Sequence, residues 1–378
     1  MRLGDIVKIE KASMPSGNNV WVLNLDAVEK GTGKVIVKNR MKADSAGTST
    51  VAFTADAVLY SKLRPNLNKV VVADEPGLAT SEMLPLIVNP EVLDRRYFAY
   101  LLRSNSFVNL AVSSTAGSKM PRMNKKTLLN AVFPIPSLEL QHQRIDLLSS
   151  IEKARTKAEL LIQQLDTLVK SRFIEMFGDL KQGYSCSSCR LGSISRIGSS
   201  RRVFRNELLS EGIPFYRGTE IAALSMGSET SPSLFISKER YDELVAITGK
   251  PEVGDLLLPS ICPDGQIWRV DTGKPFYFKD GRVLWIHPNR EIVDSIFLRH
   301  ALSILFQMSF SDIASGTTFA EMKIFLLKEL EVPLPDITVQ KKFAAFVAQV
   351  DKSRFVAQQQ IEKLQMLYDS LAQEYFGD

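Results

Sequence analysis

Basic side chains gather in short, loop-like stretches of this 378-residue sequence. The first half offers Lys62 and Arg64 in "LYSKLRPNLNK", and Lys119 and Arg122 in "AGSKMPRMNKK". Lysine and arginine neutralise phosphates, and the arginine fork can also bind guanine through two hydrogen bonds. Any one stretch alone is better explained as a solvated loop, so these residues indicate nucleic-acid binding only in combination.

The second half repeats this basic character. "RIGSSRRVFR" supplies four arginines, of which Arg201, Arg202 and Arg205 are predicted contacts, and "FYRGTEI" adds Arg217. Because both halves contain basic loops that we take to correspond, the pattern favours binding to DNA over a merely solvated surface. The residues predicted to contact DNA are Lys62, Arg64, Lys119, Arg122, Arg201, Arg202, Arg205 and Arg217.

Motifs for catalysis are missing from the sequence. "KGTGKV" at residues 30–35 lacks the upstream glycine and the Ser or Thr of a phosphate-binding loop, and neither G-x-S-x-G nor H-E-x-x-H occurs. Cys186 and Cys189 form a C-x-x-C, but Cys262 and the three histidines supply no second pair for zinc. We therefore predict a binding protein with no catalytic residue, metal site or cofactor of its own.

Composition sets wider bounds. A net charge of +5 and a pI near 8.9 permit nucleic-acid binding without requiring it. No stretch approaches the 18 apolar residues of a membrane helix, and the N-terminal "MRLGDIVKIEK" lacks the apolar run of a secretory signal. Three cysteines cannot form a disulfide framework. We expect a soluble protein of the reducing cytoplasm.

One long segment occurs twice. Pro134, Pro136 and Gln141 recur without a gap as Pro333, Pro335 and Gln340, 199 positions later. The same spacing relates "FGD" at residues 177–179 to "FGD" at residues 376–378, and it aligns the intervening residues as well. A register held over such a length predicts an internal duplication.

Each copy predicts one long helix. A Pro-x-Pro fixes an extended approach, and Ser137 or Asp336 can cap the helix that follows. Apolar residues then alternate in steps of three and four, and Ser353 and Gln360 interrupt the second copy. Two narrow apolar stripes of equal phase favour an antiparallel coiled coil about 55 Å long over two helices that dock separately. The predicted seam residues are Leu147, Ile151, Ala158, Leu165, Leu168, Phe346, Val350, Ala357, Leu364 and Leu367.

The stretches before the helices are related more weakly. "RLGDI" at residues 2–6 resembles "RLGSI" at residues 190–194, and each stretch contains short apolar strands followed by a helix, at residues 95–112 and 295–310. Residues 180–190 have the composition of a linker. We predict an α+β protein with two β-rich domains, residues 1–135 and 180–333, and two paired helices, residues 136–179 and 334–378.

The chain resembles the specificity (S) subunit of type I restriction-modification systems. The resemblance is carried by the two Pro-x-Pro helix starts, by "LYSKLRPNLNKV" with "ATSEMLPL", by "GIPFYRGTEI", and by "STAGS" and "IASGTT" before the long helices. One departure is Leu140 and Val339, where the family commonly has an acidic residue before the helix-start glutamine. This departure removes a carboxylate of the capping-box type.

The resemblance implies a role without catalysis. Each β-rich domain is then a target recognition domain that reads half of a split, asymmetric DNA site, and the helices set the spacing. Two modification subunits would use S-adenosylmethionine to methylate adenine, and two restriction subunits that use ATP and Mg²⁺ can join them. Phe173, Ile174, Val356 and Tyr368 are candidates for the docking surface.

Two other functions fit parts of the pattern. For a non-enzymatic coiled-coil scaffold with peptide- or carbohydrate-binding domains, we expect neither retention on heparin nor a steep salt dependence of duplex binding. An intact methyltransferase or nuclease predicts that the isolated chain binds S-adenosylmethionine or a metal.

Overall fold

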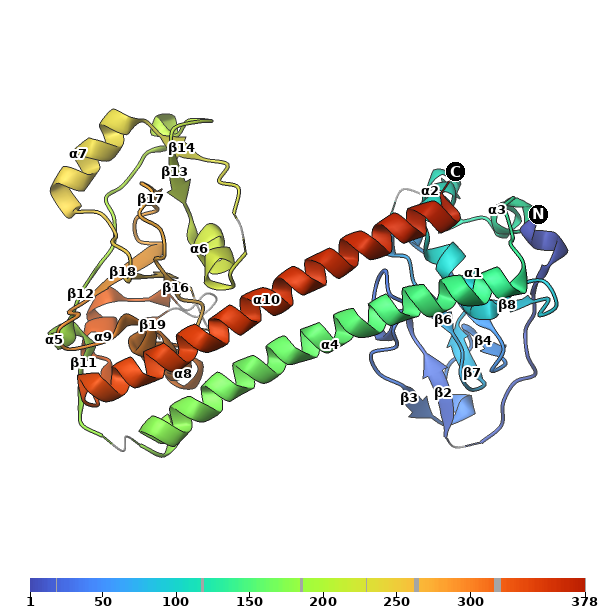
Figure 1. Ribbon diagram of the computed structural model, residues 1–378, viewed down its shortest axis with the longest axis horizontal. Helices are drawn as coiled ribbons and strands as arrows, with labels where there is room; N and C mark the ends of the chain where they lie inside the picture. Colours follow the sequence, from blue (N-terminus) through green and yellow to red (C-terminus); the bar gives the residue numbers. More distant parts are fainter. Residues whose placement is uncertain are drawn as a thin grey trace. The chain divides into compact units, whose positions relative to one another are not determined.

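The computed structural model describes residues 1–17, 19–116, 119–183, 186–228, 230–261, 265–315 and 321–377. The chain divides into two compact units (Figure 1). Unit 1 consists of Met1–Leu160 and Ala357–Asp378, and unit 2 of Leu161–Val356. Each unit thus combines one β-rich domain with one half of each long helix. Within the described part of the chain, none of the helices has the length and apolarity to cross a membrane.

Unit 1 contains two four-stranded sheets, with the strand orders β1-β8-β5-β6 and β3-β2-β7-β4. Strands β2 and β5 are buried at every position, as expected for runs of valine, leucine and aromatic residues. The strands are β1 (Val7–Ile9), β2 (Val20–Leu23), β3 (Asn39–Met41), β4 (Thr50–Phe53), β5 (Val58–Ser61), β6 (Val70–Val72), β7 (Gly77–Thr80) and β8 (Met83–Val88). They are followed by α1 (Arg95–Arg103), α2 (Asn105–Ser113), β9 (Thr115–Ala116), β10 (Arg122–Met123) and α3 (Lys125–Asn130).

The single helix predicted over residues 95–112 is wrong, because the chain breaks at Ser104 into α1 and α2. The Ser104 hydroxyl donates to the carbonyl of Leu101 (2.7 Å) and accepts from the amide of Phe107 (3.3 Å). It therefore closes one helix and caps the next.

Unit 2 has a four-stranded sheet of order β12-β18-β15-β16 and a three-stranded sheet of order β14-β13-β17. Its strands are β11 (Ser188–Arg190), β12 (Ser195–Gly198), β13 (Ile213–Tyr216), β14 (Phe235–Ile236), β15 (Leu256–Pro259), β16 (Trp268–Arg269), β17 (Tyr277–Phe278), β18 (Val283–Pro288), β19 (Ala314–Ser315), β20 (Glu321–Met322) and β21 (Glu331–Pro333). Its shorter helices are α5 (Leu191–Ile194), α6 (Gly218–Ser225), α7 (Lys238–Thr248), α8 (Ser295–Ile313) and α9 (Ile324–Glu329). The expected linker at residues 180–190 thus ends in a strand, β11, which pairs with β21.

The two units share a sheet frame. Strands β1, β8, β5 and β6 of unit 1 occupy the same order as β12, β18, β15 and β16 of unit 2, and the parallel pair β2 and β7 corresponds to the parallel pair β13 and β17. Each frame carries one further antiparallel strand, β3 beside β2 and β14 beside β13. Unit 1 also adds β4, whereas unit 2 adds α6 and α7. The predicted α+β class is confirmed, and the duplication extends through both β-rich domains.

The long helices are α4 (Leu138–Phe177) and α10 (Ile337–Phe376). In unit 1, near the start of α4 and the end of α10, the Arg144 guanidinium lies 4.5 Å from the centre of the Tyr375 ring. In unit 2, near the end of α4 and the start of α10, Phe173 packs edge-on against Phe343, with ring centres 5.5 Å apart. The helices therefore pair in antiparallel orientation, as predicted (Figure 1).

The start of each long helix is held by a fully buried glutamine. In unit 1, Gln141 Nε2 donates to the carbonyls of Val92 (2.8 Å) and Pro136 (2.9 Å), and its Oε1 accepts from the amide of Asp94 (2.8 Å). Asp94 in turn caps α1. One side chain therefore joins the Pro-x-Pro segment, the long helix and the domain.

Unit 2 repeats this arrangement group for group. Gln340 Nε2 donates to the carbonyls of Pro335 (2.7 Å) and Ile292 (3.3 Å), and its Oε1 accepts from the amide of Asp294 (2.9 Å). Asp294 accepts hydrogen bonds from the first amides of α8. The repeated glutamine is thus explained by packing and hydrogen bonding.

The seam comprises the α4 and α10 residues that face the other helix. At alternate positions, the buried residue is the one that follows the predicted residue in the sequence. Leu148 and Val169 are buried, whereas their predicted neighbours Leu147 and Leu168 are 42% and 47% exposed. Leu367 is likewise exposed, and so are Ser353 and Gln360. The remaining predicted seam residues are buried (Ile151, Ala158, Val350, Ala357) or half-buried (Leu165, Phe346, Leu364).

Two arginines at equivalent positions explain the shift. Arg155 and Arg354 lie in the row that the prediction left out, and each bonds across to the other helix. Arg155 donates to the side-chain oxygen of Gln365, and Arg354 pairs with Asp166 and with Asp351 (3.1 Å) on its own helix. A charged residue breaks the apolar periodicity, so the sequence favoured the adjacent row of leucines.

Candidate nucleic-acid interface

The structure brings together the basic residues predicted in the first domain. The amide of Met123 donates to the carbonyl of Lys62 (2.9 Å), and the amide of Arg64 donates to the carbonyl of Pro121 (2.8 Å). These bonds lay the segment before Arg122 alongside the end of β5. Arg122 therefore lies on a backbone segment adjacent to that of Lys62 and Arg64, although it follows Lys62 by some 60 residues in the sequence.

Glu82 lies between two of these basic residues. We call Lys62, Glu82 and Arg122 together the Glu82 cluster. Arg122 NH2 lies 2.9 Å from Glu82 Oε1, and Lys62 Nζ lies 3.8 Å from Oε2. The hydrogen bonds from Arg122, with the charge of Lys62, lower the pKa of Glu82 and outweigh the effect of burial. Glu82 is therefore an ionised acceptor at neutral pH.

Arg64 and Lys119 are exposed, and neither has an ion-pair partner among the residues that the structure describes. Arg64 also has φ 48° and ψ 64°, in the left-handed region that residues other than glycine rarely adopt. Such strain persists where the surroundings enforce it, and it concentrates at functional sites. Both residues remain predicted DNA contacts.

The predicted arginines of the second domain lie around β17. The Ser200 hydroxyl donates to the carbonyl of Phe278 (2.5 Å), and the amide of Arg201 donates to the Tyr277 hydroxyl (2.9 Å). Arg217 follows β13, which pairs with β17. The loop and Arg217 are therefore held against the same strand.

These arginines differ in their partners. Arg217 pairs with Glu220 (2.6 Å), and the Arg202 guanidinium lies 5.2 Å from the centre of the exposed Phe204 ring. Arg201 and Arg205 are exposed. An arginine beside an exposed aromatic ring suits stacking with bases as well as phosphate contact.

The basic loops of the two halves do not correspond, contrary to the expectation from sequence. Arg217 follows β13 where Asn24 follows β2, the equivalent strand. The position equivalent to Lys62 is Ser260, because the amide of Met322 donates to the Ser260 carbonyl (2.8 Å). The sequence comparison failed here because unequal insertions separate these loops from the aligned segments.

Sequence reasoning missed a charged group in unit 2, the Glu321 cluster, which comprises Arg282, Glu321 and Lys323. Arg282 NH1 lies 3.3 Å from Glu321 Oε1, and Lys323 Nζ lies 3.3 Å from Oε2. The hydrogen bond from the Ser260 hydroxyl (2.9 Å) is the main reason that the pKa of Glu321 is lowered. The 199-residue spacing aligns Glu321 with Arg122 and was the available signal.

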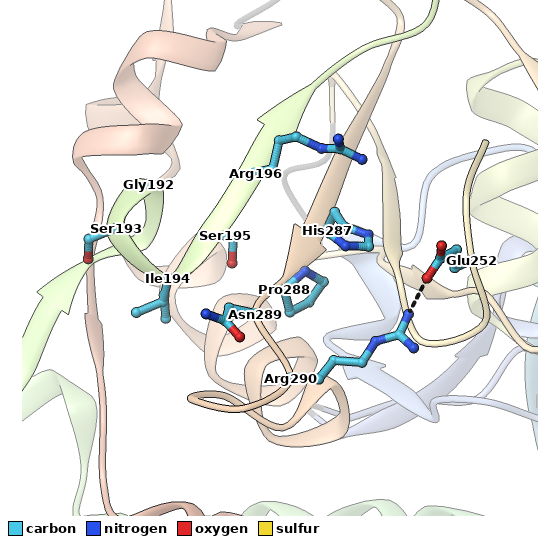
Figure 2. Close-up of a pocket in the computed structure, with 10 residues that line it drawn as sticks. All are labelled: Gly192, Ser193, Ile194, Ser195, Arg196, Glu252, His287, Pro288, Asn289 and Arg290. Carbon is cyan, nitrogen blue, oxygen red and sulfur yellow. Dashed lines mark ion pairs between the residues drawn. The ribbon is translucent and has the colours of Figure 1, made fainter. Parts of the chain in front are cut away.

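A polar pocket of about 630 Å³ lies beside β12 and β18 in unit 2 (Figure 2). Arg196, His287 and Arg290 line it together with Glu252, and Arg290 pairs with Glu252 at 3.5 Å. Three cationic or potentially cationic side chains in one pocket make it a candidate for binding a phosphate.

Its charges are balanced from within the protein. Asp255 is fully buried behind the pocket, 2.9 Å from His287 Nδ1 and 3.3 Å from Arg290 NH2, and it accepts from Trp285 Nε1 (2.7 Å). Arg196 lies over the Trp285 ring. We therefore interpret the pocket as part of the packing of unit 2. Among the described residues, no group of three or more His, Cys, Asp or Glu is placed to hold a metal ion. Cys262 lies outside the described residues.

The first β-rich domain and the first part of α4 match a known protein family. Residues 1–165 match the family model described as the type I restriction modification DNA specificity domain. The resemblance to type I specificity subunits is thereby confirmed.

Individual relatives agree with this family. A putative type I restriction enzyme specificity subunit of Haemophilus influenzae is 23% identical over 266 residues, which cover 68% of this chain and 64% of that protein, just under two thirds of its length. The type I specificity subunit MjaVIII of Methanocaldococcus jannaschii is 22% identical over 76% of this chain and 71% of its own. Both relatives are named as specificity subunits.

A solved structure shows the same fold. The specificity subunit of a type I system from M. genitalium covers 100% of this chain and 96% of its own, with a TM-score of 0.60 at 17% sequence identity.

Proposed function

We propose that this chain is the DNA sequence-recognition subunit of a type I restriction-modification complex, and that it reads an asymmetric site in two parts. The observation that carries this proposal is the pair of domains that share a sheet frame but differ in their loops. Two like frames with unlike loops suit two readers of unlike half-sites. The eight predicted DNA contacts are part of this proposal.

The paired helices would set the distance between the half-sites. A second domain held at fixed spacing binds at high effective concentration only where its half-site lies at the matching distance. Two short readings are thereby combined into one composite site. The polar seam pairs of Arg155 and Arg354 would disfavour slipped helix registers, and hence wrong spacings.

The partner subunits would dock along the long helices. Leu147, Leu161 and Leu168 recur at multiples of seven on one face of α4, and each is more than 40% exposed. Val356 of α10 is 62% exposed, whereas Phe173 is buried in the unit 2 core and cannot take the docking role considered for it. An exposed apolar row marks a protein interface. Two modification subunits, and two restriction subunits where present, are the proposed occupants.

The chemistry would lie entirely in those partners. S-adenosylmethionine, ATP and Mg²⁺ belong to them, and the chain is proposed to act with them on double-stranded DNA in the cytoplasm, away from membranes.

Mapping methylated adenines in a host that expresses the chain with its modification subunit tests the proposal. We expect one motif of two unlike parts separated by a fixed gap. A single uninterrupted motif would contradict it. A chain that neither is retained on heparin nor shows salt-dependent duplex binding would support the scaffold alternative instead.

A further inference from the structure

The Glu82 and Glu321 clusters occupy one position of the repeated sheet frame. In unit 1, the amide of Lys62 donates to the carbonyl of Glu82 (3.0 Å), and the amide of Met123 donates to the carbonyl of Lys62 (2.9 Å). Three segments, which follow β5, precede β8 and form β10, are thereby joined at one place. The side chains of Glu82 and Arg122 project from this junction.

Unit 2 repeats the junction with different side chains. The amide of Ser260 donates to the carbonyl of Arg282 (2.9 Å), and the amide of Met322 donates to the carbonyl of Ser260 (2.8 Å). Arg282 therefore stands where unit 1 has Glu82, and Glu321 stands where unit 1 has Arg122. The ion pair is kept, but the acid and the base have exchanged segments.

In both clusters the carboxylate is the less exposed partner. Glu82 and Glu321 are 21% and 25% exposed, against 44% for Arg122 and 57% for Arg282. Each glutamate has further partners: the charge of Lys62 lies 3.8 Å away in unit 1, and Ser260 and Lys323 donate hydrogen bonds in unit 2. The carboxylate thus fixes one side of the guanidinium, and the arginine remains the more accessible group.

A guanidinium oriented by a carboxylate suits base recognition. Arg122 donates from both Nε and NH2 to Glu82, which fixes the plane of its fork. Arginine binds guanine O6 and N7 bidentately, and an oriented fork loses less conformational freedom on binding than a mobile one.

We propose that Arg122 and Arg282 are the guanine-reading side chains of the two domains, and that Glu82 and Glu321 are their positioning residues. This inference rests on the proposed function. Because the arginines emerge from different segments of the same junction, they reach different positions of their half-sites. Arg282 thereby becomes a specificity residue of the second domain, which otherwise lacks a basic residue at the place of Lys62.

Lysine substitutions separate base reading from phosphate contact. Lysine keeps the charge but loses the bidentate geometry. We expect Arg282→Lys, assayed in the methyltransferase complex on duplexes randomised across the site, to lower a preference for guanine at one position of the second half-site about ten- to hundredfold. Arg122→Lys should do the same in the first half-site only. Arg190→Lys, in another exposed arginine–glutamate pair (with Glu329, 2.9 Å), is the matched control and should change neither.

The positioning role has its own readout. Glu82→Gln and Glu321→Gln should weaken the same guanine preference by a smaller factor. Thermal midpoints should change little, because the arginine of each pair is largely exposed and such ion pairs contribute little stability. Lysine variants that keep the wild-type preference at every position would overturn the inference. So would alanine variants that lower methylation of all sequences equally and are fully rescued by lysine, because that pattern marks a phosphate contact. In either case an intact two-part motif in the wild type would leave the proposed function standing.

Discussion

The two β-rich domains are alike in their sheet frame and in their attachment to the long helices, and they differ in the elements and side chains that this frame carries. In unit 1, the backbone amide of Asn89, just after β8, donates to the carbonyl of Ile6 (2.8 Å). In unit 2, the backbone amide of Asn289, just after β18, donates to the carbonyl of Ile194 (2.8 Å). The glutamine links to the helix starts also match. Selection for a constant attachment and for different binding surfaces would produce this division, with the frame kept and the loops free to diverge.

One buried position shows how far the interiors have diverged. Ala57 of unit 1 and Asp255 of unit 2 are both fully buried, and each amide donates to the carbonyl three residues earlier. Alanine needs no partner, whereas the carboxylate engages Trp285, His287 and Arg290. Unit 2 thus depends on a buried polar network at a place where unit 1 depends on packing alone.

Removal of that carboxylate should give the largest effect. Asp255→Ala leaves Trp285 Nε1 and the Arg290 charge without their buried partner, and we expect a loss of about 3–5 kcal/mol in the free energy of unfolding. Denaturant titration of the full chain measures it. Glu252→Ala, which removes an exposed pair partner, is the control and should cost under about 1 kcal/mol. Equal losses in the two variants would contradict the comparison.

The glutamine links should give smaller and equal effects. Gln141→Leu and Gln340→Leu each leave one amide and two carbonyls unpaired in a buried site, so we expect each to cost about 2–3 kcal/mol. The exposed Gln360→Leu should change stability by less than about 0.5 kcal/mol. A large loss in one variant beside a negligible loss in the other would show that the attachments are not equivalent.

A second difference concerns acid stability. Tyr100 of α1 donates to Glu152 (2.8 Å), and the equivalent His300 of α8 packs edge-on against Phe343. Burial, with the charges of Arg299 and Arg354, lowers the pKa of His300 to about 3. The unfolded chain gains this proton near pH 6.5 and the folded chain does not, so stability is full above that pH and falls as the pH drops towards 3.

We expect this histidine to lower the free energy of unfolding by about 2–3 kcal/mol at pH 4.5 relative to pH 7. Unfolding titrations at both pH values, for the wild type and for His300→Phe, measure it, and the variant should lose this component. His142→Gln, at an exposed histidine, is the control and should keep it. The interpretation fails if His300→Phe has the same pH profile as the wild type.

Substitutions of Arg64 should have the smallest effect on stability. They distinguish the contribution of backbone strain at this residue from that of its charge. Glycine accommodates a φ of 48° without the strain of a side chain, so Arg64→Gly should stabilise the chain by about 0.5–1 kcal/mol while weakening recognition of the first half-site. Arg64→Asn tolerates the left-handed backbone and removes only the charge. It should weaken recognition equally; unchanged recognition in both variants would exclude Arg64 from the interface.

Much of the frame was predictable from the sequence. The duplicated Pro-x-Pro and glutamine predicted both long helices, whose observed ends, Leu138–Phe177 and Ile337–Phe376, lie within three residues of the predicted segments. Their antiparallel pairing followed from equal length and phase. Three of the ten predicted seam residues, Leu147, Leu168 and Leu367, were misplaced, because Arg155 and Arg354 occupy inward positions that an apolar pattern cannot reveal.

The candidate interface was less predictable. Lys62, Arg64 and Arg122 come together because local basic clusters happen to flank paired backbone segments. The Glu321 cluster was invisible to a search for basic stretches, since its charges come from segments about 40 residues apart and include an acid. Helices α6 and α7 have no counterpart in unit 1, so the repeat could not indicate them, although Ser237 and Gly249 are local start and stop signals for α7.

A chimera tests the central claim most directly. In this chimera, a second copy of residues 2–133 replaces residues 190–332. The two segments begin and end at equivalent positions relative to the long helices. The methylome of the resulting complex is then mapped. The account predicts that the second half-site becomes the inverted copy of the first, with the gap between them unchanged. Retention of the original asymmetric motif would contradict the assignment of one half-site to each domain.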